Sequence, residues 1–560
     1  MNRLLAVAGT LAATGLVLAG CHANSTGSSK QSNGSADSAP VKRGGTLTVY
    51  EENTQFVTDP AKSQSLAITS SGLLYRRLTT WDVRPGHQPK YVPDLATNTG
   101  TPSDGGRTWT YTLKSGIKMS NGQTVTSSDI KYGIERSFAP ELSGGLSYHK
   151  ALLVGGDSYK GPYTGKQLAS IATPNARTIV FHLTTPYGDW PWIASMPAFA
   201  PVPKSADANP ANYGNHPVSS GPYVVQSYKE GTALTLVRNK FWSAKTDSVR
   251  SGGPNKIVVK LGQQDTVAAQ QLIADTGAAK NAFGAEPVPP AQLNQIATNA
   301  SAKARLAVSN PGALVYLAMN VQHKALADVR VRQAIEYAID KRAFQLQAGG
   351  SSQGAIATTL ITPGIPGRVA YNAYPGPQTG DVTKAKALLT AANATNLHLR
   401  LLTRNEGTYV SQAEAVQQSL KRVGISTTIV PQDDNTELDT MTNNKGDYDL
   451  TVTDWQPDFP SANGNISPLF ASNQIGNGNY NIARYSNSTV DSLIAKATGT
   501  VDRTAADKLW AQADRRIMQD APVVPLLYSR NAFLRGSGVR NFDDSQFPNY
   551  PNYLRVSLAG

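Results

Sequence analysis

The sequence predicts an α/β protein with more than one domain. Between residues 385 and 453, buried strand patterns alternate with amphipathic helix patterns, which is typical of a mainly parallel sheet covered by helices. The chain has 560 residues, which exceeds the usual size of a single domain. Hydrophobic residues make up 40% of the chain and charged residues 16%, so the composition is that of an ordinary globular protein.

The first 43 residues are expected to direct and tether the protein rather than to belong to its fold. Arg3 gives a positive start, and Leu4–Val17 is apolar but shorter than the roughly 20 residues that span a bilayer. This run ends in Leu18-Ala19-Gly20-Cys21, and Cys21 is the only cysteine, which excludes an intrachain disulfide and a cysteine-based metal cluster. Residues 22–43 are rich in Ser, Gly, Asn and Ala, and this composition predicts a flexible tether.

The first half of the chain contains strands, a hairpin and two helices. Thr126-Ser127-Ser128-Asp129 predicts the capped start of a helix that runs toward Phe138, since the Thr hydroxyl can accept a backbone N–H while Asp129 reaches back. The other predicted elements are a strand over 44–50, a strand over 109–117 followed by an Asn121-Gly122 turn, a hairpin over 224–238, a strand over 256–261 and a helix starting at 267–273.

The second half alternates more regularly. A helix over 328–340 buries Val331, Ile335 and Ile339 on one stripe, and we expect its polar face with Arg330, Gln333 and Glu336 to be solvated. The other predicted strands are 314–321, 397–402, 425–430, 448–453 and 523–527, and the other predicted helices are 385–392, 411–423 with Gly424 at its end, 490–497 and 505–518.

The stretch Tyr448–Phe470 carries the candidate binding residues. A buried strand ends in a loop with Asp454, Trp455, Asp458 and Phe459 between prolines, and proline stops the ladder because it lacks a backbone N–H. A carboxylate between two aromatic rings could hold a cation such as a free amino terminus. The alternative is a solvated aspartate in a turn beside a tryptophan of the core.

Other functional classes find little support in the residues. Lys and Arg outnumber Asp and Glu by 52 to 39, yet the basic residues are spread along the chain, which argues against nucleic-acid binding. The seven histidines are scattered, so we expect no zinc site, and no G-x-S-x-G elbow occurs. We therefore expect no enzymatic activity and no cofactor.

Several ordered motifs carry a resemblance to a known family. SGIKMSNGQTVTSSDIKYGIERSF at 115–138, SSGPYVVQSYKEGTALTLVRNKFW at 219–242, DVRVRQAIEYAID at 328–340 and the Trp455-x-x-Asp458-Phe459 loop resemble the extracellular solute-binding proteins of ABC importers, in the oligopeptide-binding group of family 5. Leu18-Ala19-Gly20-Cys21 resembles a bacterial lipobox.

The resemblance implies a type II periplasmic-binding-protein-like fold, with two α/β lobes joined by hinge strands and a subdomain inserted in the first lobe. The expected division is a lipoprotein signal peptide at 1–20, a flexible tether at 21–43, lobe I at 44–70, 203–305 and 527–560, its inserted subdomain at 71–202, and lobe II at 306–526.

The resemblance also implies that the protein captures oligopeptides between its lobes and delivers them to a membrane permease driven by ATPase subunits. Asp458 would pair with the peptide's amino terminus beside Trp455 and Phe459, and Asn53 and Phe56 would face the cleft. A lipid on Cys21 would hold the protein, expected to be a monomer, at the extracytoplasmic face of the cell membrane. Phe459-Pro460-Ser461-Ala462 departs from the family's usual polar run, which leaves the pocket's shape open.

Two alternatives remain open from the sequence. The same scaffold could bind another solute, such as a sugar, a lipoglycan fragment or a metal chelate, since only the cleft would differ. It could also serve as a sensor or cell-wall protein without transport.

Overall fold

The computed structural model describes residues 40–84, 86–542, 547 and 550–560. All of these residues belong to one compact unit. Cys21 and the predicted signal peptide therefore lie outside the described residues. Among the residues that are described, no helix combines the length and the apolar character needed to cross a bilayer.

A five-stranded sheet in the order β11-β1-β10-β9-β8 contains the predicted first strand and the predicted hairpin. β1 lies parallel to both β10 and β11, whereas β10, β9 and β8 are antiparallel neighbours. Its strands are β1 (Thr46–Tyr50), β8 (Tyr223–Lys229), β9 (Ala233–Arg238), β10 (Lys256–Lys260) and β11 (Ala282–Gly284), and the helices near it are α5 (Asp265–Ala274), α6 (Pro290–Thr298) and α7 (Ala300–Lys303).

A smaller antiparallel sheet in the order β4-β5-β7-β6 lies between β1 and β8 in the sequence. The capping box is confirmed, because Thr126 Oγ1 accepts from the N–H of Asp129 and the Asp129 carboxylate accepts from the N–H of Thr126. The strand predicted over 109–117 is shorter in the structure and spans Thr108–Thr112, and the chain turns a few residues later at Gly116, whose φ is +72°. The elements of this region are α1 (Ser71–Leu74), β2 (Thr79–Asp82), β3 (Lys90–Pro93), β4 (Thr101–Ser103), β5 (Thr108–Thr112), α2 (Ser127–Arg136), α3 (Tyr148–Leu152), β6 (Ile171–Asn175), β7 (Thr178–His182) and α4 (Trp190–Ile193).

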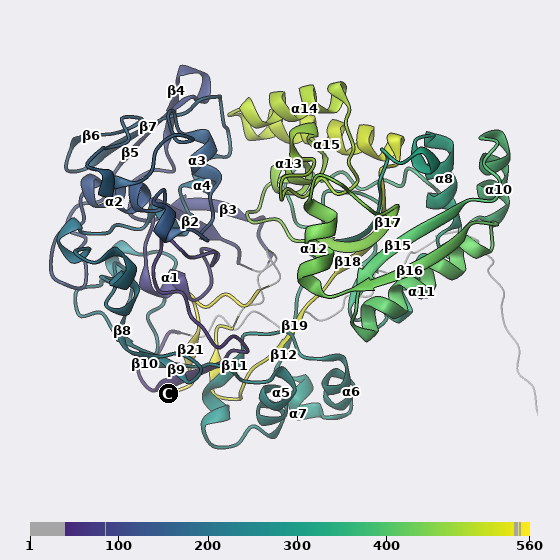
Figure 1. Cartoon of the computed structure of the whole chain (residues 1–560). Helices are drawn as coiled ribbons and strands as arrows, with labels where there is room; N and C mark the ends of the chain where they lie inside the picture. The colour runs from purple at the N-terminus through teal and green to yellow at the C-terminus, as the bar shows by residue number, and fades with distance from the viewer. Residues whose placement is uncertain (1–39, 85, 543–546, 548–549) are drawn as a thin grey trace, which may run out of the picture. The chain divides into compact units, whose positions relative to one another are not determined.

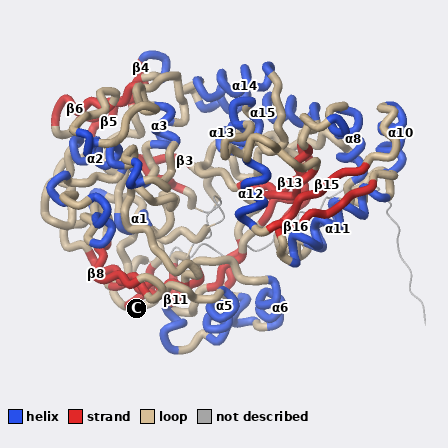
Figure 2. Tube along the Cα trace, in the orientation of Figure 1, coloured by secondary structure: helices blue, strands red, loops and turns tan. Residues whose placement is uncertain are grey.

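A six-stranded sheet in the order β14-β18-β13-β17-β15-β16 forms the other large part (Figure 2). Its strands are β13 (Ala313–Met319), β14 (Gly354–Ile356), β15 (His398–Arg404), β16 (Ser426–Gln432), β17 (Leu450–Trp455) and β18 (Val523–Ser529). Its helices are α8 (Val329–Ala338), α9 (Lys341–Gln347), α10 (Val382–Ala391), α11 (Gly407–Lys421), α12 (Asp434–Thr442), α13 (Ala462–Phe470), α14 (Ser488–Gly499) and α15 (Arg503–Asp520) (Figure 1).

The prediction that this sheet is mainly parallel was wrong. β15 runs parallel to β16 and β17, but β13 is antiparallel to β17 and β18, and β14 is antiparallel to β18. Helical crossovers between β15, β16 and β17 make those three strands parallel. The direction of β13 and β18 depends on pairings with strands more than 100 residues away in the sequence. The alternation of strands and helices along the chain carries no information about these pairings.

Two neighbouring connections join the large sheets. β12 (Leu306–Val308) leads from the five-stranded side into β13, and β19 (Ala532–Leu534) leads back after β18. β12 and β19 pair with each other in antiparallel register, from Leu306 opposite Leu534 to Val308 opposite Ala532. The chain then ends with β20 (Val539–Arg540) and β21 (Ser557–Leu558). Two adjacent strands that cross between the two large sheets in this way can act as a hinge between lobes.

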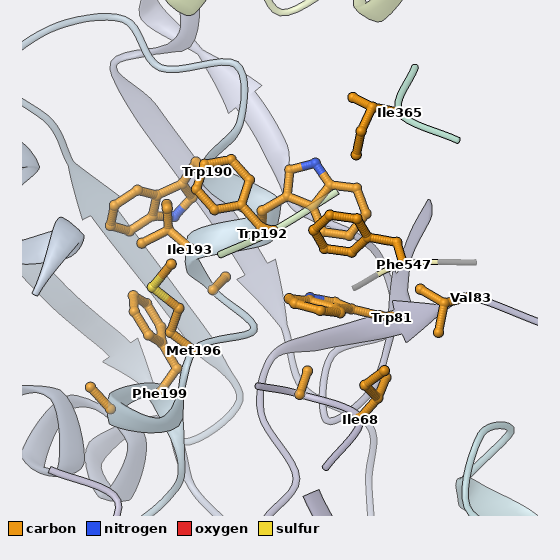
Figure 3. Close-up of a cluster of buried hydrophobic side chains, with 14 of the residues drawn as sticks. Ile68, Trp81, Val83, Trp190, Trp192, Ile193, Met196, Phe199, Ile365 and Phe547 are labelled. Carbon is orange, nitrogen blue, oxygen red and sulfur yellow. The ribbon is translucent and has the colours of Figure 1, made fainter. Parts of the chain in front are cut away.

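Aromatic side chains fill much of the core beside α4. Figure 3 shows Trp190, Trp192 and Phe199 together with Trp81 and other buried apolar side chains. The rings of Trp81 and Trp192 meet edge to face, with centroids 5.9 Å apart. Such large buried rings contribute much of the apolar burial that stabilises the fold.

Glu336 corrects one expectation about α8. The sequence placed it on a solvated face, but its side chain is buried and neither carboxylate oxygen has a hydrogen-bond partner in the described part of the chain. The Nζ of Lys341 lies 3.7 Å from the carboxylate. Burial raises the pKa of Glu336 to about 7, and Lys341 opposes this shift only in part.

We expect Glu336 to make the folded state less stable as the pH rises. Its pKa is higher when folded than when unfolded, so the folded state holds the extra proton between about pH 4.5 and about pH 7, and stability falls across that window. Replacing Glu336 by Gln should raise the unfolding free energy at pH 8 by up to about 3 kcal/mol relative to the parent, and change it little at pH 4.5. Urea unfolding at both pH values measures this difference, and an equal effect at both would contradict it.

Candidate ligand-binding site

A cavity of about 670 Å³ collects residues from distant parts of the chain. One side is formed by the loop after β1, and another by Gln456, Pro457 and Asp458, which directly follow β17. The cavity is lined by Glu51, Asn53, Gln55, Phe56, Val57, Lys62, Gln64, Ser65, Leu66, Thr69, Ser70, Gly144, Gln456, Pro457, Asp458 and Tyr550. Three of the five predicted ligand-binding residues, Asp458, Asn53 and Phe56, are thus brought together.

Asp458 is half-buried and has a specific partner. Its Oδ2 accepts a hydrogen bond of 2.6 Å from the hydroxyl of Tyr148, the first residue of α3. Burial raises the pKa of the Asp458 carboxyl, and the Tyr148 hydrogen bond partly offsets this effect. Asp458 therefore lines the cavity as a partly desolvated acid, which is not the freely solvated aspartate of the alternative interpretation.

The two rings predicted beside Asp458 take supporting positions. Trp455 is half-buried at the end of β17, donates from Nε1 to the carbonyl of Gly464 at 2.7 Å, and lies 5.0 Å from the ring of Tyr480. Phe459 is only 1% exposed and packs edge to face on Tyr148, with centroids 5.7 Å apart. Neither ring belongs to the cavity lining, and Phe459 instead supports the tyrosine that binds Asp458.

Asn53 and Phe56 line the cavity from the loop after β1. Asn53 is exposed, and its Nδ2 donates to Glu51 Oε1 at 2.7 Å. Phe56 is half-buried, and its backbone N–H donates to the Tyr228 hydroxyl at 3.0 Å. These contacts fix the loop after β1, so that its side chains face the cavity.

Acidic groups around this cavity were not all expected from the sequence. Glu51 follows β1 and Glu286 follows β11, and these parallel strands place Tyr50 opposite Gly284, so the two acids emerge side by side. Burial and the neighbouring Glu51 raise the pKa of Glu286 to about 7. The pKa of Tyr550 is raised by burial and by Glu286, Asp454 and Asp458.

Asp454 adds to this acidic character. More than a third of its surface is accessible, yet desolvation raises the pKa of its carboxyl, with Arg404 opposing the shift. A side chain can be both accessible and desolvated where it stands in a cleft with protein on most sides. In the part of the chain that the structure describes, no group of three or more His, Cys, Asp or Glu side chains is placed to hold a metal ion.

Comparison with known protein families shows which family has this architecture. Residues 90–477 match the family described as bacterial extracellular solute-binding proteins, family 5, middle region. The chain belongs to this family. Family members are binding proteins of ABC importers that work outside the cytoplasm and carry out no catalysis, so the predictions of class and of no enzymatic activity are confirmed.

Individual relatives agree with the family match. The chain is 26% identical over 438 residues to the glutathione-binding protein GsiB of Salmonella typhimurium, covering 77% of this chain and 79% of that protein. The solved structure of clavulanic acid biosynthesis oligopeptide binding protein 2 is 32% identical with a TM-score of 0.86, covering 93% of this chain and 96% of that one.

A third comparison extends the structural likeness. The unliganded open form of MppA, a periplasmic murein tripeptide binding protein, has a TM-score of 0.73 at 22% identity, covering 92% and 97% of the two chains. At this identity the likeness concerns the fold alone. The predicted periplasmic-binding-protein-like fold of two α/β lobes is confirmed.

Proposed function

We propose that the protein captures short peptides in the cavity at Asp458 and delivers them to an ABC importer. The observation that carries the proposal is a half-buried carboxylate that lines a cavity of about 670 Å³ and accepts a hydrogen bond from Tyr148. The relatives named for oligopeptides and for glutathione bind ligands that share amide and carboxylate groups, and this supports the same ligand class here.

The chemistry of the site suits an amino terminus. A peptide ammonium group would donate to Asp458, whose second oxygen Oδ1 accepts no side-chain hydrogen bond in the described part of the chain. Partial desolvation strengthens such a charge pair, because the surrounding protein screens it less than water does. Asn53 and Phe56, which line the same cavity, would contact the peptide farther along, while Trp455 and Phe459 hold the loop that presents Asp458.

The remaining parts of the proposal concern location and domains. Cys21 would carry the lipid anchor, with residues 1–20 as signal peptide and 21–43 as tether. Lobe I would comprise 44–70, 203–305 and 527–560 with the insert at 71–202, and lobe II would comprise 306–526. The cavity then takes its lining from both lobes and the insert, as capture between closing lobes requires.

Mass spectrometry of small molecules released from the purified chain tests the ligand class. We expect peptides with free amino termini, recovered intact. Recovery of a sugar, a lipoglycan fragment or a metal chelate in their place would overturn the proposal and favour the corresponding alternative.

A further inference from the structure

A buried aspartate joins the segment that carries α3 and α4 to the segment that carries α13 and α15. Asp189, at the start of α4, is 2% exposed. Its carboxylate pairs with the guanidinium of Arg503, the first residue of α15, and accepts from Ser461 Oγ at 2.9 Å. Arg503 Nη2 lies 3.4 Å from the same hydroxyl. We call Asp189, Ser461 and Arg503 the polar latch.

Neighbouring contacts extend the polar latch along both segments. Asn463 Nδ2 donates to the Tyr187 hydroxyl at 3.0 Å, and the N–H of Gly188 donates to the carbonyl of Thr498 at 2.7 Å. A Cβ on Gly188 would lie 2.2 Å from the carbonyl oxygen of Thr500, so only glycine permits this approach. Figure 1 shows α14, which contains Thr498, reaching the part of the molecule that holds β4.

The polar latch is continuous with the loop that presents Asp458. Ser461 stands three residues after Asp458 and caps α13, with its side chain accepting from the N–H of Asn463. The N–H of Ser461 donates to the carbonyl of Phe459 at 2.8 Å, which makes the loop a tight turn. The α3–α4 segment thus fixes this loop at two points, through Tyr148 on Asp458 and through Asp189 on Ser461.

We propose that Asp189 and Arg503 are positioning residues that hold the 456–461 loop in its ligand-ready position and keep the α3–α4 segment against α13 and α15 before any ligand arrives. The contact is built from charged and hydrogen-bonding groups, which water can replace when the segments separate. Ligand binding then costs less reorganisation, since apparent affinity scales with the fraction of molecules already in the competent arrangement.

The inference rests on the proposed function only where it concerns peptide affinity, so its first test uses no ligand. The chain with Cys21→Ala has no other cysteine, and spin labels at Lys166→Cys and Ala495→Cys, both exposed, report the distance between the two segments. Asp189→Asn and Gly188→Ala should each lengthen or broaden this distance in double electron–electron resonance. Gly407→Ala, where a Cβ meets nothing within 4 Å, is the matched control and should leave it unchanged.

Affinity provides the second readout, measured by calorimetry with alanine peptides of two to five residues. Asp189→Asn should weaken binding about tenfold. The charge-exchanged double variant Asp189→Arg with Arg503→Asp should recover part of the loss. Unchanged distances in both Asp189→Asn and Gly188→Ala would overturn the latch itself. Altered distances with unchanged affinity would overturn its link to the ligand, whereas failure of the parent to bind any peptide would contradict only the proposed function.

Discussion

Replacing Asp458 by asparagine is expected to weaken the binding of alanine peptides with free amino termini by about 30-fold or more. Removing one partner of a partly buried charge pair costs about 2 kcal/mol at the least, which corresponds to that factor. Asparagine preserves the size of the side chain and can still accept from Tyr148, so the lost charge is the main change. Isothermal titration calorimetry gives the dissociation constants directly.

The matched control is Asp447→Asn, three residues before β17. Asp447 is exposed and pairs with Arg400 at the surface, away from the cavity lining. It changes the net charge of the protein by the same amount, so a long-range effect of charge would appear in both variants. Equal affinities for Asp458→Asn and the parent would contradict the role of Asp458.

The largest loss of stability is expected for Arg136→Met. The Arg136 guanidinium, with no exposed side-chain surface, donates to both oxygens of Asp59 at 2.8 and 3.0 Å and to both oxygens of Asp207 at 2.7 and 3.1 Å. Methionine fills similar space but leaves two buried carboxylates without their cation. Breaking such a buried pair costs about 3 to 5 kcal/mol, which should appear as a lower midpoint in urea unfolding.

Arg330→Met tests whether this loss comes from burial. Arg330 also pairs with an aspartate, Asp328, at 2.7 Å, but it is exposed on α8. Exposed pairs contribute little because water and salt screen them, so no measurable change in the midpoint is expected. A similar shift in both variants would contradict the assignment of Arg136 as the buried centre of this network.

Much of the fold could be predicted because its signals are local. The capping box at Thr126, the apolar stripe of α8 and the alternation in β1 each involve residues a few positions apart, and all three elements form as expected. Strand direction in the six-stranded sheet and the burial of Glu336 depend on what packs against them from elsewhere. Those partners leave no local pattern in the sequence.

The candidate site divides in the same way. The composition of the loop after β17 was enough to predict Asp458 as a binding residue, and Asn53 and Phe56 were predicted in the loop after β1. All three line the cavity. Tyr148 lies 310 residues from Asp458 in the chain, in a short helix without a distinctive motif, and nothing nearby in the sequence marks it as a partner. The sequence could not show whether the Phe459 ring faces the ligand or is buried behind the loop, since an aromatic residue beside a proline occurs in both positions.

Blocking the amino group of the ligand tests the central claim most directly. Binding of alanine peptides to the parent chain is compared with binding of the same peptides after N-acetylation, which removes the positive charge and leaves the backbone intact. If Asp458 binds the amino terminus, acetylation weakens binding to the parent by about 30-fold or more and has far less effect on Asp458→Asn. Equal binding of free and acetylated peptides to the parent chain would contradict the claim.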